Sequence, residues 1–229
     1  KKKIKSPANR VTTSSEFSDI KLGIALDNAF GFYYADDIDK IQSLGVKIHY
    51  FNTMKHKKLP KVDALLIGGG FPELFSSKLS FNKNMMASVK DFVESNKPVY
   101  AECGGLMYLA KSIKFKNKTV KMVGAINGKV IMHTKPVGRG HVELTQHSKH
   151  PWPMRNEIIR AHEFHYSNII LNSKTNSFAY KVKRGYGING KYDGVLYKNL
   201  LATYSHLRDT KQSMWIKNYL QFIKNNKKS

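Results

Sequence analysis

Short apolar runs and amphipathic stretches take turns along the first half of the chain. The apolar runs are typical of buried strands and cover residues 21–27, 46–51, 63–70 and 98–102. Apolar positions at helical spacing predict helices over 36–45 and 84–96. Because strands that alternate with helices form parallel βαβ units, this half predicts a mostly parallel open sheet flanked by helices.

The second half of the chain has a different pattern. Short runs with strand character follow one another without helices between them, over 140–147, 159–167, 177–185 and 200–207. A last helix is predicted from about Lys211 to Ile223. The predicted fold class is therefore α/β, with extra β-structure in the second half.

Residues 1–20 lack a regular apolar pattern and are polar and rich in Ser and Thr, which predicts a tail or linker. The chain begins at Lys1 and not at Met, so we expect a missing upstream piece. The predicted organisation is a linker over 1–20 and one folded domain over 21–229.

Composition narrows the class of protein. Hydrophobic residues make up 41% of 229, as in a globular chain, and no apolar run is long enough for a membrane span. One cysteine excludes an internal disulfide and every zinc site with several cysteines, so no metal site is predicted. These features lead us to expect a protein of the cytoplasm.

The net charge of +23 raises the alternative of a basic nucleic-acid-binding module. The positive residues are 33 Lys and only 6 Arg, scattered along the whole chain. Arg is the residue that favours bidentate contacts with phosphates and bases, so this distribution argues against nucleic acid.

The lone cysteine lies in "VYAECGGLMYLA", between an apolar strand and a helix-forming run. A nucleophile is displayed well on such a sharp strand-to-helix turn, where small neighbours such as Gly104 and Gly105 are needed. The helix N-terminus would stabilise a thiolate on Cys103, and the amide of Gly104 could stabilise an oxyanion. The alternative is an unreactive cysteine buried in the core.

Two further segments suit such a site. In "LLIGGGFPEL" (65–74), glycines follow a buried strand at the sheet end where α/β proteins hold ligands, although a plain tight turn is the alternative. Among nine histidines, His206 follows a predicted strand and would lie at its end. His162 and His165 lack the spacing of a zinc protease. The residues alone support a cysteine nucleophile without identifying its reaction.

Several segments together resemble one known family, the glutaminase domain of cobyrinic acid a,c-diamide synthases, which are class I glutamine amidotransferases of the cobalamin-synthesis kind. The similar segments are "ALDNAFGFYYADDID", "LLIGGGFPEL", "YAECGGLMYL", "MVGAINGKVIM", "HEFHYS" and "LLATYSHL". The resemblance runs from about Lys21 to Asp209. It implies a flavodoxin-like sheet of the amidotransferase type.

The resemblance also implies roles for individual residues. Cys103 would attack the side-chain amide of glutamine, with His206 activating the thiol and protonating the leaving ammonia. The amides of Gly69, Gly70 and Gly104 would hold the oxyanion. Many relatives carry a Glu two residues after the histidine, where this chain has Arg208, so the resemblance implies a Cys–His pair without an assigned carboxylate.

The family's other half is an upstream amidoligase domain that uses ATP and magnesium. No phosphate-binding loop occurs in these 229 residues, so we expect no cofactor in this chain and a dependence on that domain for the tetrapyrrole acceptor. A homodimer stays open. The alternatives are the same amidation of nickel-sirohydrochlorin in coenzyme F-four-thirty synthesis, or a glutaminase or cysteine hydrolase for another acceptor.

Overall fold

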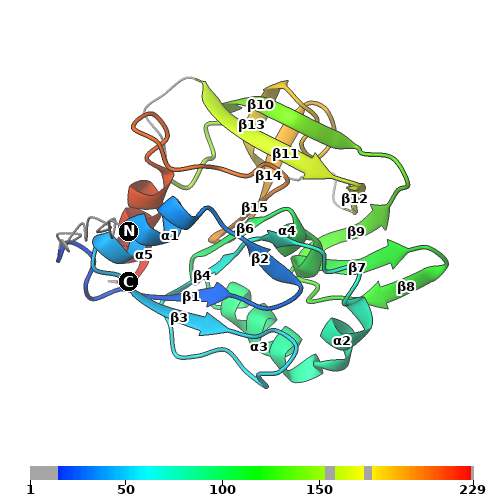
Figure 1. Cartoon of the computed structure of the whole chain (residues 1–229), viewed down its shortest axis with the longest axis horizontal. Helices are drawn as coiled ribbons and strands as arrows, with labels where there is room; N and C mark the ends of the chain where they lie inside the picture. Colours follow the sequence, from blue (N-terminus) through cyan, green and yellow to red (C-terminus); the bar gives the residue numbers. More distant parts are fainter. Residues whose placement is uncertain (1–14, 153–157, 173–176, 228–229) are drawn as a thin grey trace, which may run out of the picture.

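The computed structural model describes residues 15–152, 158–172 and 177–227. Its main element is a nine-stranded sheet in the order β11-β10-β13-β14-β15-β6-β4-β1-β3 (Figure 1). Neighbouring strands from β15 to β3 are parallel, and those from β11 to β15 are antiparallel. The predicted α/β class, with parallel winding first and additional strands later, is confirmed.

The parallel part of the sheet comes mainly from the first half of the chain. Its strands are β1 (Lys21–Ala25), β3 (Lys47–Phe51), β4 (Ala64–Ile67), β6 (Val99–Glu102) and β15 (Leu200–Thr203). Every residue of β4, β6 and β15 is buried. These strands carry almost continuous apolar runs because both faces of a parallel sheet are covered.

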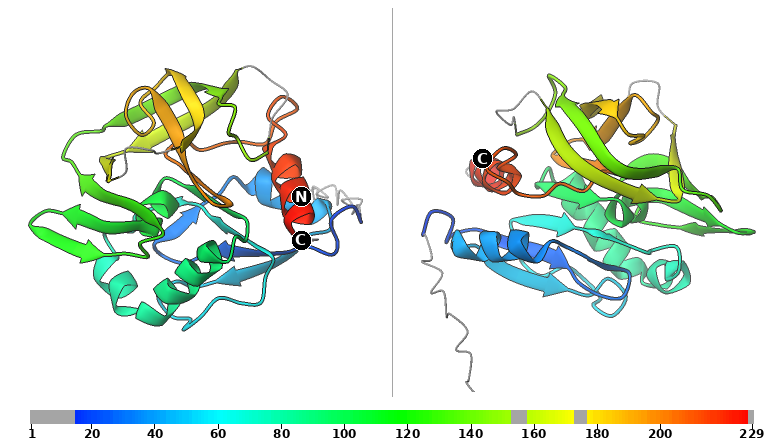
Figure 2. Two further views of the ribbon diagram at one scale, coloured as in Figure 1. Left: turned by 180° about the vertical axis from the view of Figure 1, so that it is seen from behind. Right: turned by 45° about the horizontal axis from the view of Figure 1, so that its top comes forward.

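Helices cover the two faces of this parallel part. On one face, Leu65 and Ile67 share a core with α3 (Lys83–Glu94) and α4 (Gly104–Leu109). On the other, Leu66 and Tyr100 share a core with α1 (Ala35–Ser43) and α5 (Trp215–Lys227), as Figure 2 shows from two sides. Successive strand residues thus supply opposite cores, which is the expected alternation of a strand.

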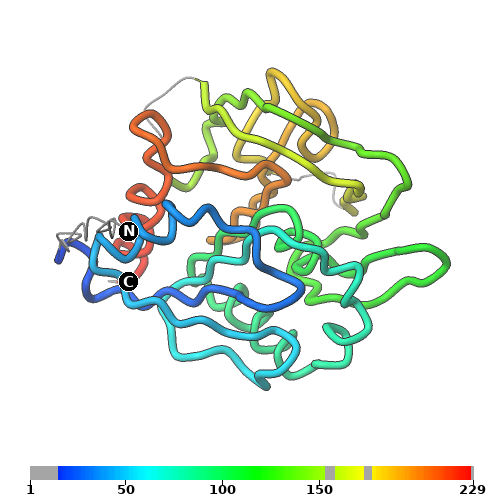
Figure 3. The backbone as a smooth tube through the Cα atoms, viewed as in Figure 1, coloured from blue at the N-terminus to red at the C-terminus, as the bar shows by residue number. Residues whose placement is uncertain are grey.

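The antiparallel part continues the same sheet. Its strands are β10 (Gly138–Gln146), β11 (Ile159–His165), β13 (Ser177–Arg184) and β14 (Tyr192–Tyr197). An isolated bridge pairs His162 of β11 with His206, just after β15. In the tube of Figure 3, the segment that follows β15 accordingly passes beside β11.

Two smaller sheets complete the described fold. One has the order β12-β9-β7-β8 and contains β7 (Ala110–Phe115), β8 (Lys118–Lys121), β9 (Ile126–Met132) and β12 (Ser167–Leu171). The other pairs β2 (Phe30–Phe32) with β5 (Gly69–Gly70). A short helix, α2 (Ser76–Phe81), precedes α3. None of the described helices is long and apolar enough to span a membrane.

Some predicted boundaries differ from the structure. The last helix spans Trp215–Lys227 and not 211–223, because Ser213 caps the preceding turn through hydrogen bonds with Thr210. The predicted strand over 63–70 divides at Gly68, since β5 leaves the main sheet to pair with β2.

The predicted linker over 1–20 also needs a correction at its end. Residues 1–14 lie outside the described part, but Phe17 and Ile20 are fully buried in the core. The amide of Phe17 donates to the carbonyl of Leu44, and the amide of Lys47 donates to that of Ile20. The packed domain therefore begins before residue 21.

Candidate active site

Cys103 occupies the turn between β6 and α4, as the sequence predicted. Its backbone has φ 46° and ψ −99°, a conformation that is strained for a residue with a side chain. Two backbone hydrogen bonds hold the turn: the Cys103 amide donates to the Thr203 carbonyl at 2.7 Å, and the Met107 amide donates to the Cys103 carbonyl at 3.0 Å. Strain of this kind persists where the surroundings fix it, and it is frequent at catalytic turns.

A cavity of about 340 Å³ opens over the thiol. Cys103 is 7% exposed and lines this cavity, so it is not sealed inside the core. The cavity is lined by residues of the aromatic block, the glycine segment, the cysteine turn, β11 and the segment after β15: Gly31, Phe32, Tyr33, Tyr34, Gly70, Phe71, Glu102, Cys103, His162, Phe164 and His206.

His206 lines the same cavity as the Cys103 thiol, and Cys103 is among the groups that raise the pKa of its imidazole. The thiol itself donates to the Phe164 carbonyl at 4.0 Å. A partner of the imidazole ring is Glu102, whose Oε2 lies 3.2 Å from Nδ1. Glu102 is itself held in place, because its Oε1 accepts hydrogen bonds from the Tyr100 hydroxyl at 2.7 Å and the Leu207 amide at 2.9 Å. The structure thus forms a row of thiol, imidazole and carboxylate from Cys103, His206 and Glu102.

The row determines the protonation of the imidazole. Burial lowers the pKa of His206, but hydrogen bonds to Cys103 and Glu102 outweigh burial and raise the pKa to about 10. At neutral pH the ring therefore carries a proton, which it could give to a leaving group at the thiol.

Glu102 is the site residue that the sequence reasoning missed. The carboxylate was sought two residues after the histidine, at the position of Arg208, and Arg208 instead pairs with Asp36 at the surface at 2.6 Å. The sequence did carry a signal for Glu102, because this glutamate ends a strand whose other residues are apolar. A charged side chain buried at such a position needs partners.

The predicted glycines approach the site closely. A Cβ on Gly69 would lie 2.5 Å from His206 Cε1, and one on Gly104 would lie 2.9 Å from the Gly70 amide nitrogen. Only glycine fits at these positions without displacing the ring or the backbone. Gly104 is the first residue of α4, where an amide has no partner within the helix, so Gly70 and Gly104 are placed together beside the thiol.

The histidines of "HEFHYS" separate into two environments. His162 lines the cavity, with its ring centroid 5.5 Å from that of His206. His165 is buried away from the cavity. Its Nε2 lies 3.5 Å from Oε2 of Glu163, and its ring stacks on that of Tyr204 with 3.9 Å between the centroids. The aromatic block contributes Phe32, Tyr33 and Tyr34 to the cavity wall, whereas Phe30 is in the core.

The fold and the cysteine turn define a class I glutamine amidotransferase-like protein. A glutamine amidotransferase from Thermotoga maritima superposes with a TM-score of 0.60 at 15% identity, covering 92% of this chain and 86% of that one. PurLQS from the same organism superposes with a TM-score of 0.63 at 15% identity, covering 90% of this chain and 98% of that one.

The chain belongs to the CobB/CobQ-like glutamine amidotransferase domain family, which it matches over residues 21–213. It is 39% identical over 188 residues to the cobyrinate a,c-diamide synthase of Magnetococcus marinus, and 40% identical over 187 residues to that of Methanosphaera stadtmanae. These matches cover 82% and 81% of this chain but 40% of each relative, so the chain spans less than half the length of these relatives.

Proposed function

We propose that this chain is the glutaminase part of a cobyrinate a,c-diamide synthase, releasing ammonia from glutamine for amidation of the acetate carboxylates of a tetrapyrrole. The observation that carries the proposal is the strained Cys103 turn with His206 and Glu102 in one row. Family membership and the names of the relatives support the reaction and the acceptor.

The first half of the proposed reaction forms a thioester. The Cys103 thiolate attacks the amide carbon of glutamine, and the negative charge moves to the amide oxygen. We assign the amides of Gly70 and Gly104 as donors to that oxyanion, which the close approach of these two glycines beside Cys103 supports. As the carbon–nitrogen bond breaks, the imidazolium of His206 gives its proton to the nitrogen, which leaves as ammonia.

The second half restores the enzyme. His206, now neutral, takes a proton from water, and the resulting hydroxide attacks the γ-glutamyl thioester. Collapse of the second tetrahedral intermediate releases glutamate and the Cys103 thiolate, with the proton back on His206. Glu102 stabilises the imidazolium and fixes the ring orientation throughout.

The acceptor reaction requires a second part of the enzyme. Activation of a carboxylate by ATP and magnesium needs a phosphate-binding loop, and this sequence has no Gly-Lys-Ser/Thr after its glycine segment. We assign ATP, magnesium and the tetrapyrrole to an amidoligase domain, with this chain supplying ammonia. The generally positive charge of the chain suits a partner that handles a carboxylate-rich substrate.

The Cys103→Ala variant tests the glutaminase assignment. We expect the wild-type chain to release glutamate from glutamine and the variant to release none, because no other cysteine can form the thioester. The measurement is glutamate release, with circular dichroism and the melting temperature of both proteins as the folding control. Equal rates from two folded proteins would reject the assignment.

A further inference from the structure

The proposed reaction leaves one part of glutamine without a partner in the site. Cys103, His206 and the glycine amides act on the side-chain amide, whereas the α-carboxylate and α-amino group lie at the other end of the molecule. Three carbon–carbon bonds separate the amide carbon from the α-carbon, a span of about 4 Å when extended. A site specific for glutamine needs polar groups at that distance from the thiol.

Most polar side chains of the cavity are already committed. Glu102 accepts hydrogen bonds from Tyr100 and Leu207 and contacts His206. The Tyr33 hydroxyl donates to the Ala25 carbonyl at 2.5 Å and accepts from the Gly68 amide at 2.9 Å. These groups have little hydrogen-bonding capacity left for a ligand.

Two polar side chains of the cavity wall remain. Neither the imidazole of His162 nor the hydroxyl of Tyr34 hydrogen-bonds to another residue in the described ranges. Both are only partly covered, and they come from different parts of the chain, β11 and the residue before α1. Of the two, only the imidazole can take up a proton and so pair with a carboxylate as a cation.

The position of His162 suits the far end of glutamine. Its ring centroid lies 5.5 Å from that of His206, and both rings line the cavity over the thiol. The bridge between the two backbones fixes this spacing: the His206 amide donates to the His162 carbonyl at 2.7 Å, and the His162 amide donates back at 3.2 Å. The two imidazoles are thus held side by side in the cavity wall.

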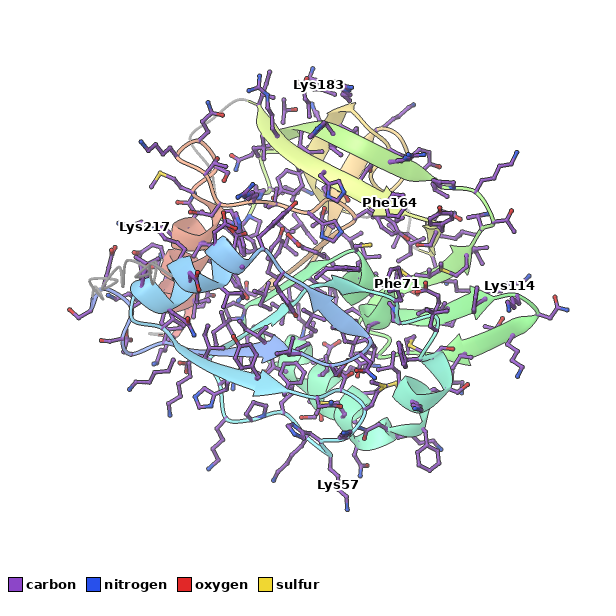
Figure 4. The ribbon with its side chains drawn as sticks, viewed as in Figure 1. Lys57, Phe71, Lys114, Phe164, Lys183 and Lys217 are labelled. Carbon is purple, nitrogen blue, oxygen red and sulfur yellow. The ribbon has the colours of Figure 1, made fainter. Side chains whose placement is uncertain are left out.

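The apolar wall supports the same orientation. Phe32, Phe71 and Phe164 line the cavity and are about half exposed, with Phe32 and Phe71 in edge contact at 5.3 Å. Figure 4 labels Phe71, which follows β5, and Phe164 of β11, and both lie toward the middle of the view. Such rings pack well on the methylene groups of glutamine, between its two polar ends.

We propose that His162 binds the α-carboxylate of glutamine, with the Tyr34 hydroxyl as a second donor, and so selects glutamine over amides without that carboxylate. This inference rests on the proposed function, since it names the residues that recognise its substrate. Burial and the nearby His206 lower the pKa of His162, and an arriving carboxylate opposes both effects.

The experiment measures binding separately from chemistry. In the Cys103→Ala background, calorimetry gives the dissociation constants of L-glutamine and of 4-aminobutanamide, which is glutamine without the α-carboxylate. We expect His162→Ala to weaken glutamine binding about tenfold, the loss of one charge-assisted hydrogen bond, and to leave 4-aminobutanamide unchanged. Tyr34→Phe should weaken glutamine binding by a smaller factor, because the hydroxyl is an uncharged donor and no ion pair is lost with it.

His49→Ala is the matched control. His49 is an exposed histidine of β3 that does not line the cavity, so both dissociation constants should stay at the starting values. If His162→Ala leaves glutamine binding unchanged, or weakens both ligands equally, the inference is overturned. If the starting protein does not bind glutamine, the inference and the proposed function fail together. If the Cys103→Ala protein binds glutamine but the wild-type chain does not hydrolyse it, only the proposed function is overturned.

Discussion

Glu102 and Cys103 are adjacent in the chain and yet meet the same imidazole. Successive residues of a strand point to opposite faces, and Glu102 follows this rule by sharing a face with Tyr100, two residues earlier. Cys103 leaves the alternation because its φ is 46°. The strained turn therefore brings the thiol to His206 on the side where the carboxylate already lies.

The Glu102→Gln variant tests the role of this carboxylate as a positioning group. We expect kcat for glutamine to fall about 10²-fold or more, with a smaller change in KM, because the ring loses its orientation and the imidazolium its counter-charge. Without the carboxylate the pKa of His206 falls from its raised value, so the pH profile should change as well.

The measurement is the pH dependence of Cys103 alkylation by iodoacetamide, together with steady-state kinetics. Glu143→Gln, on the exposed side of β10, is the control and should behave as wild type. An unchanged pH profile in folded Glu102→Gln protein would contradict the assigned role.

Residue types and spacing predicted the cysteine turn and the glycine segment because local rules govern both. The pairing of Cys103 with His206 spans 103 residues, and family resemblance supplied the choice among nine histidines. Glu102 was missed because its role depends on a contact with residues 206 and 207 that the sequence does not display. His162 was similarly undistinguished from His165 until β11 placed them on opposite faces.

At the level of elements, the strands and helices of the first half were predictable, since each has its own apolar pattern. The small sheet was not, because β7 and β8 lie in the lysine-rich segment "KSIKFKNKTVK", which resembles a solvated loop. Its apolar positions, such as Ile113, are buried because β7 pairs with β9 and packs against α4. Tertiary contacts decide such strands.

The segment between β10 and β11 contains a buried histidine that couples packing to pH. Trp152 packs on Tyr100 and Tyr219, and its amide donates to His150 Nδ1 at 3.2 Å. The Nε2 of His150 lies 3.0 Å from the Tyr180 hydroxyl. Burial lowers the pKa of His150 to about 4, so the folded protein keeps this ring neutral.

This histidine gives a pH-dependent contribution to stability. Between pH 6.5 and 4 the unfolded chain binds a proton that folded His150 does not, so the free energy of unfolding falls as the pH is lowered. Above pH 6.5 the free energy of unfolding contains the whole of this contribution, which is on the order of 3 kcal/mol. His150→Asn, which keeps an acceptor for the Trp152 amide, should remove most of this dependence.

Urea unfolding of both proteins at pH 4.5 and 7 measures the difference. The exposed His49 provides a control, because His49→Gln should keep the wild-type dependence on pH. The same loss of stability on acidification in wild type and His150→Asn would contradict the assignment.

At the scale of the whole molecule, the charge of +23 is dispersed. Lys57, Lys114, Lys183 and Lys217 lie at separate places on the periphery, as Figure 4 shows, and belong to different parts of the sequence. The dispersed lysines agree with the argument against a single nucleic-acid groove, while the cavity over Cys103 is lined largely by aromatic groups.

The proposed dependence on a second domain leads to a prediction for the complete enzyme. We expect weak glutamine hydrolysis by this chain alone and a faster rate when an amidoligase domain, ATP, magnesium and cobyrinic acid are supplied, because acceptor binding then gates ammonia release. Glutamate release with each component omitted in turn is the measurement. An unchanged rate with all components present would contradict gating.

The pairing of residues 162 and 206 has a consequence for the antiparallel half of the molecule. β11, β10, β13, β14 and β15 are neighbours in that order, and the bridge joins the first of these strands to the chain just beyond the last. The five strands therefore close into a ring with no free edge at this point. Two backbone hydrogen bonds close this seam, so it is where the ring can part with the fewest bonds broken. A substitution that weakens this seam would therefore separate the two imidazoles that line the cavity, while the parallel strands stay in register.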